Sequence, residues 1–361
     1  MELRENVALA PLTTLEIGGP AEFFVRITSV DELRAALAFA NERSLAVTVL
    51  GGGSNLVVHD RGVCGLVVLA AMEGITWHEQ PAAVLATVAA GESWDGFVRA
   101  SVERGLTGIE CLSGIPGLVG GTPIQNVGAY GQEVADTIVR VHAMDRTTLA
   151  PRTFSHEECC FAYRHSRFKS DLRGAFVVTA VEFNLRRGIA PSLRYGELAK
   201  HFGDRAPSVA EVRDAVVALR RSKSMVLDPS DENARSAGSF FTNPIVKSHV
   251  ADDVEAIRVS LGLPPMPRFP ASPGSVKLAA GWLIEQAGFF KGQRFGAVGI
   301  SSRHALALVN RGGASSHDLA SAALEVKRGV AARFGVVLIP EPEFVGFEEA
   351  ELMPLRTNAL V

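Results

Sequence analysis

The sequence lacks the features that mark several large classes of protein. It has only 4 cysteines in 361 residues. Cys64, Cys111 and the adjacent pair Cys159-Cys160 show neither a C-x-x-C spacing nor histidines at metal-ligand intervals. We therefore expect neither a disulfide scaffold nor a metal site. Basic residues number 36 and acidic residues 39, for a formal net charge of −3. Without excess basic charge to bind phosphates, a nucleic-acid partner is not expected.

Long apolar stretches are also missing. The first six residues are charged and lack the apolar segment of a signal peptide. No run approaches the roughly 18 apolar residues that a membrane helix needs. We therefore expect a cytoplasmic protein with no membrane partner.

What is present is the composition of a globular enzyme, with 47% hydrophobic and 21% charged residues. The chain is too long for one ordinary core, so two or three domains are expected. Propensity, periodicity and capping residues predict the regular elements. Helices are expected at 30–40, 94–104, 209–222, 276–287 and 318–334, and strands at 45–50, 56–58, 84–90, 175–185 and 336–339. Five prolines within 263–273 predict a rigid loop without regular structure.

The segment from Gly114 to Gly131 is the first candidate binding site. Its eighteen residues include six glycines and no charged side chain. Glycine costs backbone entropy on folding, so such a stretch is typical of a backbone that must approach something closely. Successive N–H groups can form an anion-binding nest, and the side chains of Thr122, Gln125 and Asn126 add hydrogen-bonding groups. The segment indicates a wall of a phosphate-bearing cofactor site; a tight glycine-rich corner between packed elements is the alternative.

A second candidate phosphate cradle follows the strand expected at 45–50. It reads Gly51-Gly52-Gly53-Ser54-Asn55. No Gly-Lys-Ser/Thr follows, so it is not a Walker loop. The next residues, 56–58, continue as a strand rather than a helix, which excludes the dinucleotide-binding G-x-G-x-x-G arrangement as well.

Three further short segments carry polar groups in unusual settings. They are Tyr163-Arg164, Gly238-Ser239-Phe240-Phe241 and Pro342-Glu343. Each has a plain interpretation taken alone: a solvated arginine, a serine in a turn or cap, and an exposed loop carboxylate. No G-x-S-x-G elbow surrounds Ser239, so a hydrolase triad gains no support.

Taken together and in order, these motifs resemble those of the UDP-N-acetylenolpyruvoylglucosamine reductases, in particular the members with a tyrosine-bearing loop. The resemblance runs from about residue 11 to about residue 347. It also includes Ile115-Pro116-Gly117, the run 123–131 (Pro-Ile-Gln-Asn-Val-Gly-Ala-Tyr-Gly), Asn243-Pro244 and the run 277–284 (Lys-Leu-Ala-Ala-Gly-Trp-Leu-Ile).

The resemblance implies an α+β fold with three domains. Two would form an FAD-binding unit of the vanillyl-alcohol-oxidase type, and a third, C-terminal domain would bind the substrate. We expect the FAD-binding subdomains at 1–70 and 71–222 and the UDP-sugar domain at 223–334. The tail, 335–361, would return to the first subdomain.

The resemblance also implies an activity. NADPH would reduce FAD, and hydride would pass from flavin N5 to the vinyl carbon of UDP-N-acetylglucosamine enolpyruvate, giving UDP-N-acetylmuramate for peptidoglycan synthesis. By matching positions, Arg164 and Glu343 would stabilise the negative charge that develops on the substrate carboxylate, and Ser239 would donate the proton. The partners would be the UDP-sugar and NADPH, bound by a monomer.

The remaining site residues follow from the same matching. FAD contacts are expected from Gly51, Gly52, Gly53, Ser54, Asn55, Gly121, Thr122, Gln125 and Gly128. Substrate contacts are expected from Tyr130, Tyr195, Lys223 and Asn243. Two positions depart from the family pattern: Val345 stands where arginine is common, and Thr242 where lysine is frequent. Both affect expected substrate affinity more than chemistry.

Two other functions remain open on the residues alone. One is another flavin oxidoreductase of the same fold, such as an alcohol or lactone oxidase, although the histidine through which those often attach FAD is missing from the glycine segments. The other is a nucleotide-sugar-binding protein without catalysis. Such a protein would keep the glycine segments but would not need Arg164, Ser239 and Glu343 together.

Overall fold

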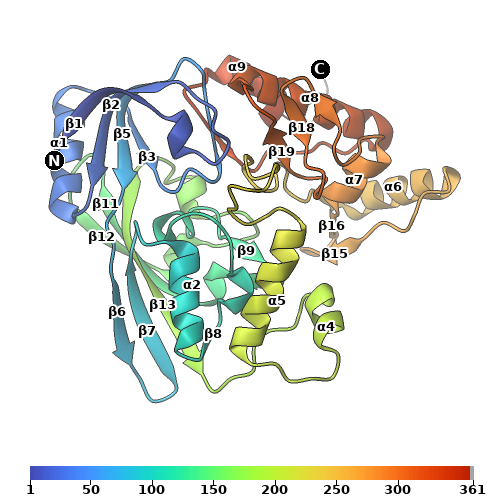
Figure 1. Ribbon diagram of the computed structural model, residues 1–361, viewed down its shortest axis with the longest axis horizontal. Coiled ribbons are helices and arrows are strands. Elements are labelled where there is room, and N and C mark those ends of the chain that lie inside the picture. Colours follow the sequence, from blue (N-terminus) through green and yellow to red (C-terminus); the bar gives the residue numbers. More distant parts are fainter. Residues whose placement is uncertain (358–361) are drawn as a thin grey trace. The chain divides into compact units, whose positions relative to one another are not determined.

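A computed structural model describes residues 1–357, and the chain divides into two compact units (Figure 1). Unit 1 comprises residues 1–7, 21–53 and 64–227. Unit 2 comprises residues 8–20, 54–63 and 228–361, of which the last four lie outside the described part. Each unit is described by itself.

The first sheet of unit 1 has four strands in the order β1-β2-β5-β3. Their bounds are β1 Leu3–Ala8, β2 Pro20–Ile27, β3 Val47–Leu50 and β5 Val63–Ala70. Helix α1, Val30–Glu42, begins where the Ser29 side chain accepts a hydrogen bond from the Glu32 N–H. Strand β3 pairs in parallel with β5 and ends directly at the three glycines 51–53.

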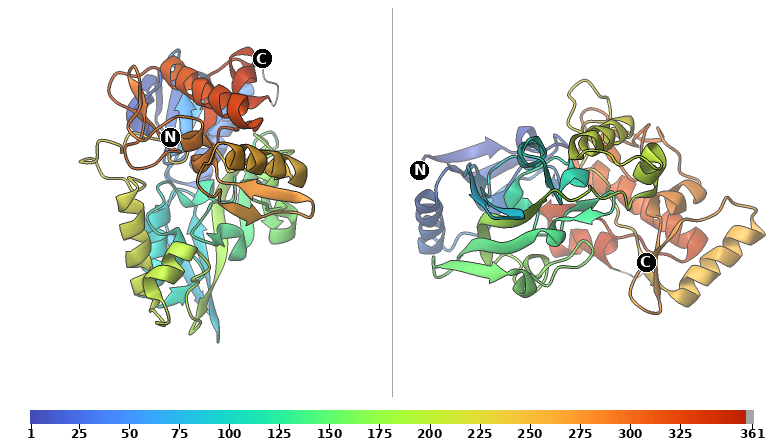
Figure 2. Two further views of the ribbon diagram at one scale, coloured as in Figure 1. Left: turned by 90° about the vertical axis from the view of Figure 1, so that its right-hand side faces the viewer. Right: turned by 90° about the horizontal axis from the view of Figure 1, so that it is seen from below.

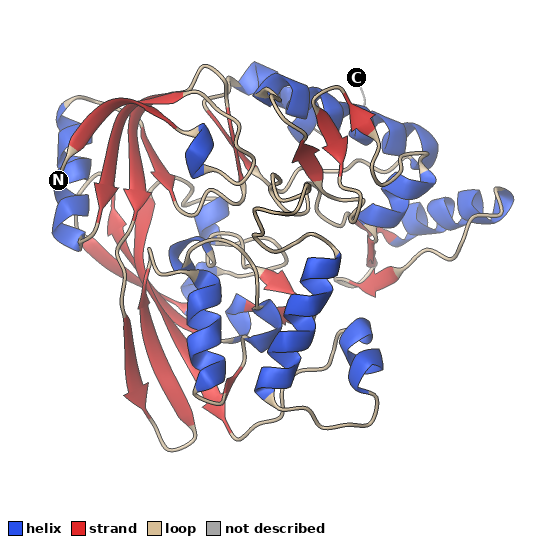
Figure 3. Cartoon of the chain, in the orientation of Figure 1, coloured by secondary structure: helices blue, strands red, loops and turns tan. Residues whose placement is uncertain are grey.

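The second sheet of unit 1 is antiparallel, with the order β12-β11-β13-β7-β6 and β8 added beside β13 (Figure 3). The strands are β6 Ile75–Glu79, β7 Ala83–Ala89, β8 Leu106–Thr107, β11 Ile138–Asp145, β12 Pro151–Ser155 and β13 Phe176–Arg187. The helices of this part are α2 Trp94–Glu103, α3 His156–Cys159, α4 Gly196–Phe202 and α5 Val209–Ser222. Short 3-10 turns η2 Glu110–Leu112, η3 Val119–Gly121, η4 Val134–Asp136 and η5 Arg167–Lys169 shape the connections.

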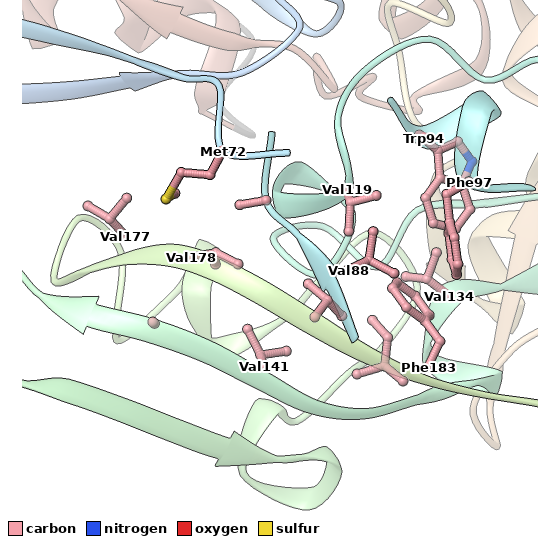
Figure 4. Packing of buried hydrophobic residues seen from close by; sticks show 14 of the residues in the cluster. Met72, Val88, Trp94, Phe97, Val119, Val134, Val141, Val177, Val178 and Phe183 are labelled. Carbon is pink, nitrogen blue, oxygen red and sulfur yellow. The ribbon is translucent and has the colours of Figure 1, made fainter. Parts of the chain in front are cut away.

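One hydrophobic cluster joins both sheets of unit 1 (Figure 4). Every second residue of β7 is buried, because alternate side chains of a strand point to opposite faces. Phe183 of β13 lies beside Ala86 of β7 on that face, and Trp94 and Phe97 of α2 pack against it, with ring centroids 5.0–6.0 Å apart. Apolar burial of this extent stabilises the sheet that supports the glycine segment, where the Gly120 N–H donates to the Ala90 carbonyl just beyond β7.

Unit 2 is built from short strands and four helices. Its sheets have the orders β14-β16-β15, β17-β18-β19 and β20-β4. The strands are β4 Leu56–Val58, β14 Ile245–Lys247, β15 Arg268–Pro270, β16 Ser275–Leu278, β17 Arg294–Phe295, β18 Val298–Ile300, β19 Leu308–Asn310 and β20 Glu343–Val345. The helices are α6 Ser248–Ser260, α7 Ala280–Gln286, α8 Ser316–Phe334 and α9 Glu349–Arg356, with the 3-10 turn η1 at Ala10–Leu12. Figure 2 shows α8, in orange-red, as a long straight helix of this unit.

Most predicted elements are confirmed within a few residues, but three predictions for unit 2 are wrong. The first half of the helix expected at 276–287 is strand β16, because these residues pair with β14 on one side and β15 on the other. The proline-rich stretch contains strand β15, which is tolerated because β15 is an edge strand. No strand covers 336–339. The strand that rejoins an earlier one is β20, paired in parallel with β4.

Candidate active site

The two glycine stretches of unit 1 touch backbone to backbone. A Cβ added at Gly52 would lie 2.8 Å from the Cα of Gly117, a distance that real Cβ atoms do not tolerate. Gly53 has φ of 62°, a conformation that glycine adopts without strain. Neither position can therefore carry a larger side chain easily. At this contact the two segments present main-chain atoms without side chains.

Packing within the protein requires glycine at position 120, whereas no atom of the described residues, 1–357, requires it at position 121. A Cβ at Gly120 would lie 2.6 Å from the Cβ of Ala90, so packing within the protein excludes any side chain there. At Gly121, by contrast, a Cβ would meet no atom within 4 Å, and the residue is exposed. The protein itself thus leaves space beside Gly121. The neighbouring Thr122 is buried and donates its hydroxyl to the Val119 carbonyl at 2.8 Å, which closes the 3-10 turn.

Helix α2 holds the start of the long glycine segment. The Asp95 carboxylate accepts from the Gly114 N–H at 2.6 Å and forms two hydrogen bonds with the Arg213 guanidinium, at 2.7 and 2.9 Å. Burial raises the pKa of Asp95, but hydrogen bonds from Arg213 and Gly114 outweigh it and leave the pKa below its usual value. The Trp94 N–H also donates to the Gly117 carbonyl at 3.1 Å. The segment is therefore anchored at Gly114 and Gly117.

Arg164 is attached to the far end of the same segment. Its Nη2 donates to the Gly128 carbonyl at 3.0 Å, and its backbone has φ of 53°. Asn126, also at positive φ, is buried and donates to the Glu133 carboxylate at 2.7 Å and to the Ala162 carbonyl at 3.1 Å. These bonds join the loop that carries Arg164 to the glycine segment. The Gln125 side chain accepts from Lys169 Nζ at 3.4 Å.

Three of the four predicted substrate residues lie together in unit 1. Tyr130 occupies the turn between β9 Gly128–Ala129 and β10 Gln132–Glu133. Its ring packs edge-on against that of Tyr195, with centroids 4.9 Å apart. The Lys223 Nζ lies 5.9 and 6.0 Å from the two ring centroids and pairs with the Glu197 carboxylate at 2.8 Å. A cation beside two phenols is an arrangement that can bind phosphate oxygens.

The phenols of this cluster stay protonated over a wide pH range. Burial, with the nearby Glu197 carboxylate, raises the pKa of Tyr195 to about 12. Burial also raises the pKa of Tyr130, although the Arg220 guanidinium opposes that shift. Both hydroxyls therefore stay protonated at neutral pH, and that of Tyr195 donates to the Glu197 carboxylate at 3.4 Å.

Ser239 and Glu343 belong to unit 2, where main-chain hydrogen bonds join their segments. The Glu341 N–H donates to the Phe240 carbonyl at 2.8 Å, and the Phe240 N–H donates to the Leu306 carbonyl at 2.7 Å. The Glu343 N–H donates to the Asn55 carbonyl at 3.0 Å. Ser239, Asn55 and Glu343 therefore lie on adjoining stretches of one unit, although almost 300 residues of sequence separate them. Ser239 and Glu343 are both half-buried.

Asn243 has a local role that the sequence did not suggest. Its Oδ1 accepts from the Ala280 N–H at 2.9 Å, at the start of α7. Asn243 and Ser54 lie in unit 2, whereas the tyrosine–lysine cluster lies in unit 1.

The two residues that depart from the family pattern have structural partners. Val345 pairs with Val58 in the β20–β4 ladder, and Thr242 donates its N–H to the Ile339 carbonyl at 3.1 Å.

Sequence reasoning missed three residues that hold the site: Asp95, Glu110 and Arg220. The Arg220 side chain lies beside Gly114 and donates from Nη2 to the Met225 carbonyl, while its Nε is enclosed and has no hydrogen-bond partner within residues 1–357. One signal was available, since Arg220 lies one helical turn before Lys223. No motif surrounds Asp95 or Glu110, so the sequence alone does not identify them as supports of the site.

Residues 1–357 contain no group of three or more His, Cys, Asp or Glu side chains that could hold a metal ion. No helix within the same range is both long and apolar enough to cross a membrane.

Comparison with known proteins gives consistent matches along the chain. Residues 21–148 match the model of an FAD binding domain, and residues 228–345 match the C-terminal domain of UDP-N-acetylenolpyruvoylglucosamine reductase. The reductase of that name from Thermobifida fusca is 49% identical over 94% of this chain and 97% of its own length. The one from Streptomyces avermitilis is 45% identical over 95% of both chains.

A solved structure agrees with these matches. The crystal structure of the reductase from Thermus caldophilus is 27% identical and has a TM-score of 0.63, covering 95% of this chain and all of that one. The predicted α+β fold class, with an FAD-binding part followed by a C-terminal domain, is confirmed. FAD is accordingly the cofactor of this oxidoreductase. The chain belongs to the UDP-N-acetylenolpyruvoylglucosamine reductase family, as its ordered motifs predicted.

Proposed function

We propose that this chain uses NADPH to reduce UDP-N-acetylglucosamine enolpyruvate to UDP-N-acetylmuramate, in the synthesis of peptidoglycan precursors. The observation that carries the proposal is the joining of the Ser239 and Glu343 segments through the Phe240–Glu341 hydrogen bond. This bond joins the segment that carries the Ser239 hydroxyl to the segment that carries the Glu343 carboxylate. A protein that only bound a nucleotide sugar would not need these two segments to be joined.

The glycine segments fit the cofactor. Gly52 and Gly117 touch without side chains, and Gly121 has open space where a Cβ would stand. We propose that Gly51, Gly52, Gly53, Ser54 and Asn55 hold FAD together with Gly121, Thr122, Gln125 and Gly128. Their N–H groups suit phosphate, which favours a concave run of backbone donors. When bound, FAD supplies the hydride transfer that links NADPH to the vinyl carbon of the substrate.

Arg164 and Glu343 are proposed to act on the substrate carboxylate. Addition of hydride to the vinyl group places negative charge on the adjoining carbon and, by conjugation, on that carboxylate. The guanidinium of Arg164 stays protonated and can pair with a carboxylate through two hydrogen bonds. Its bond to Gly128 holds it at the end of the glycine segment. Glu343 would polarise the same carboxylate by sharing a proton or through a bridging water.

Ser239 is proposed to protonate the carbon that carries the charge. Its hydroxyl is small and neutral, and the flanking Phe240 is fully buried and fixed through both its N–H and its carbonyl. The main chain at Ser239 is therefore held in place while the side chain stays half-buried. General-acid catalysis requires such a fixed donor near the reacting atom.

The tyrosine–lysine cluster is proposed to bind the diphosphate of the UDP-sugar. Lys223 supplies the charge, and the protonated phenols of Tyr130 and Tyr195 supply donors. Tyr195 lies in the connection between β13 and α4, which favours the subclass with a tyrosine-bearing loop. Asn243 is retained as a proposed substrate contact.

The domain limits also stay a proposal. We retain FAD-binding subdomains at 1–70 and 71–222, a substrate domain at 223–334 and a returning tail at 335–361. The end of the FAD-binding match at residue 148 and the start of the C-terminal match at residue 228 support a boundary between them.

The test follows both halves of the reaction in the purified protein under anaerobic conditions. Bound flavin absorbance should be present, NADPH should bleach it, and the enolpyruvyl substrate should restore it. UDP-N-acetylglucosamine, which lacks the enolpyruvyl group, should not restore it and serves as the control. A colourless protein that does not take up added FAD would contradict the proposal. Bleached flavin that the substrate does not reoxidise would contradict the assigned reaction.

A further inference from the structure

A buried carboxylate, Glu110, connects the two parts of the chain that carry Tyr130 and Tyr195. Glu110 lies in η2 and is 1% exposed. Its Oε2 accepts from the Gly108 N–H at 2.6 Å, and its Oε1 accepts from Gln132 Nε2 at 2.9 Å and from the Ser192 N–H at 3.0 Å. Three donors thus converge on one side chain. None of the proposed steps uses it.

The next residue completes a clamp on the loop that leads to Tyr195. The Cys111 thiol donates to the Ser192 carbonyl at 3.3 Å, so both main-chain groups of Ser192 are bound by consecutive residues of η2. Burial, with the adjacent Glu110 carboxylate, raises the pKa of the Cys111 thiol to about 12, so it remains a donor. Tyr195 follows only three residues later.

Gln132 holds the hairpin of Tyr130 in the same way. Its Nε2 donates to Glu110, and its Oε1 accepts from the Cys111 N–H at 2.8 Å. Gln132 pairs with Ala129 across the turn made by Tyr130 and Gly131. At Gly131 a Cβ would lie 3.1 Å from the Cβ of Arg194, so the hairpin and the tyrosine loop are also in close contact.

We propose that Glu110 is a positioning residue for the substrate site, because it fixes the Tyr130 hairpin and the Tyr195 loop relative to each other. The inference rests on the proposed function in one respect, namely that the two tyrosines bind the UDP-sugar. A carboxylate suits the task because it only accepts hydrogen bonds, and three donors point at it. Bonds to an ionised acceptor are also stronger than those to a neutral one.

The variant Glu110→Gln tests this role at nearly constant volume. One carboxylate oxygen becomes an NH2 group, which must face a donor whichever way the amide turns. We expect the KM for the UDP-sugar to rise about tenfold, the factor that corresponds to the loss of one hydrogen bond to a charged group at the low end of its range. FAD content and the rate of flavin reduction by NADPH should stay within about twofold. Glu103→Gln, an exposed glutamate at the end of α2, is the matched control.

Fluorine NMR of the flavoprotein gives a readout that does not depend on substrate. The chain has only 3 tyrosines, so incorporation of 3-fluorotyrosine gives three resonances, which Tyr130→Phe and Tyr195→Phe assign. In Glu110→Gln the resonances of Tyr130 and Tyr195 should move, while that of Tyr163 should not. The double variant Glu110→Gln, Gln132→Glu should rescue only Tyr130. It restores the pair between residues 110 and 132 but leaves the Ser192 N–H without its acceptor.

The outcomes separate the two proposals. Unchanged Tyr130 and Tyr195 resonances in Glu110→Gln would overturn the positioning role and leave the proposed function standing. Shifted resonances with an unchanged KM in Glu110→Gln, Tyr130→Phe and Tyr195→Phe would show that the tyrosines do not bind substrate. That result would overturn the positioning role and the proposed tyrosine contacts, whereas the proposed reaction fails only if the enolpyruvyl substrate does not reoxidise the reduced flavin. If Glu110→Gln does not fold, Gln132→Met takes its place. It removes only the hairpin link, so Tyr130 must shift more than Tyr195 if the inference holds.

Discussion

The two units hold their proposed site residues by different means. In unit 1, polar side chains do most of the holding: the half-buried Asp95 binds Gly114, the buried Asn126 binds the Arg164 loop, and the buried Glu110 binds two connections at once. In unit 2, the segments of Ser239 and Glu343 are joined mainly through main-chain hydrogen bonds. The side chain of Ser239 can therefore be changed without removing these main-chain bonds. The same is not true of the supports in unit 1.

The difference has a consequence for mutagenesis. A buried polar group that loses its partner costs free energy of folding, whereas a main-chain bond survives substitution of the side chain. Variants of the unit 2 residues should thus separate chemistry from stability. Variants of the unit 1 supports should alter both binding and stability.

Ser239→Ala should give the largest loss. Without the proton donor, reoxidation of the reduced flavin by substrate should slow by about 10²–10⁴-fold. Flavin reduction by NADPH and the urea midpoint should barely change, because main-chain bonds hold the segment. Anaerobic stopped-flow absorbance measures both half-reactions, with Ser260→Ala, an exposed serine of α6, as control. Equal loss in both half-reactions would mean that Ser239 is structural.

Arg164→Lys should slow reoxidation by about 100-fold, the effect of losing an oriented charged donor at a developing negative charge. Lysine keeps the charge but not the two-pronged geometry that pairs with a carboxylate. The bond to Gly128 is also lost, so a small decrease in flavin retention should accompany the loss of rate. The same stopped-flow assay and a flavin-release measurement test the prediction. Full activity in the lysine variant would exclude the paired-carboxylate role.

Asp95→Asn should lower the free energy of unfolding of the flavoprotein by about 0.5–1.5 kcal/mol, because the hydrogen bonds to Arg213 and Gly114 are weakened while solvent screens part of the interaction of this half-buried carboxylate. The pKa of Asp95 is lowered in the folded state. Its contribution is therefore present above the unfolded pKa of about 3.9 and is lost as pH falls through the lower folded pKa. Urea unfolding at pH 7 should show the difference, and it should shrink below about pH 4. Asp214→Asn, exposed on α5, is the control, and an equal effect there would contradict the prediction.

The smallest effect concerns Tyr195. Its pKa is raised to about 12, so its hydroxyl should not ionise between pH 9 and 10.5, whereas an unperturbed phenol titrates near 10. Phenolate absorbance at 295 nm should therefore be equal in the wild type and Tyr195→Phe over that range, and should differ only towards pH 12. The folded state loses stability as pH rises from about 10 to 12, since unfolding releases the proton. A difference between the two proteins at pH 10 would place Tyr195 in an exposed setting.

Sequence reasoning succeeded where the signal is local. The helix at Val209–Ser222 begins at a capping box of Ser208 and Glu211, and the structure has both reciprocal bonds. The β3 strand ends at its glycines as the composition predicted. The reasoning failed where pairing with distant residues decides: residues 276–278 form a strand because β14 and β15 flank them. Glu110 escaped notice because two of its three donors, Gln132 and Ser192, come from distant parts of the chain.

The sequence by itself determined the chemistry that the chain can offer and the family to which it belongs. Six glycines without a charge, together with Tyr163-Arg164, Gly238-Ser239 and Pro342-Glu343 in one order, already indicated a flavin reductase. Tertiary structure alone decided which of these residues share a unit and what holds them. The pairing of strands, the packing of the tyrosine rings and the hydrogen bonds to the buried Glu110 carboxylate join residues that meet only after folding. Burial stabilises these contacts, and a local sequence pattern does not reveal which distant residues will be buried together.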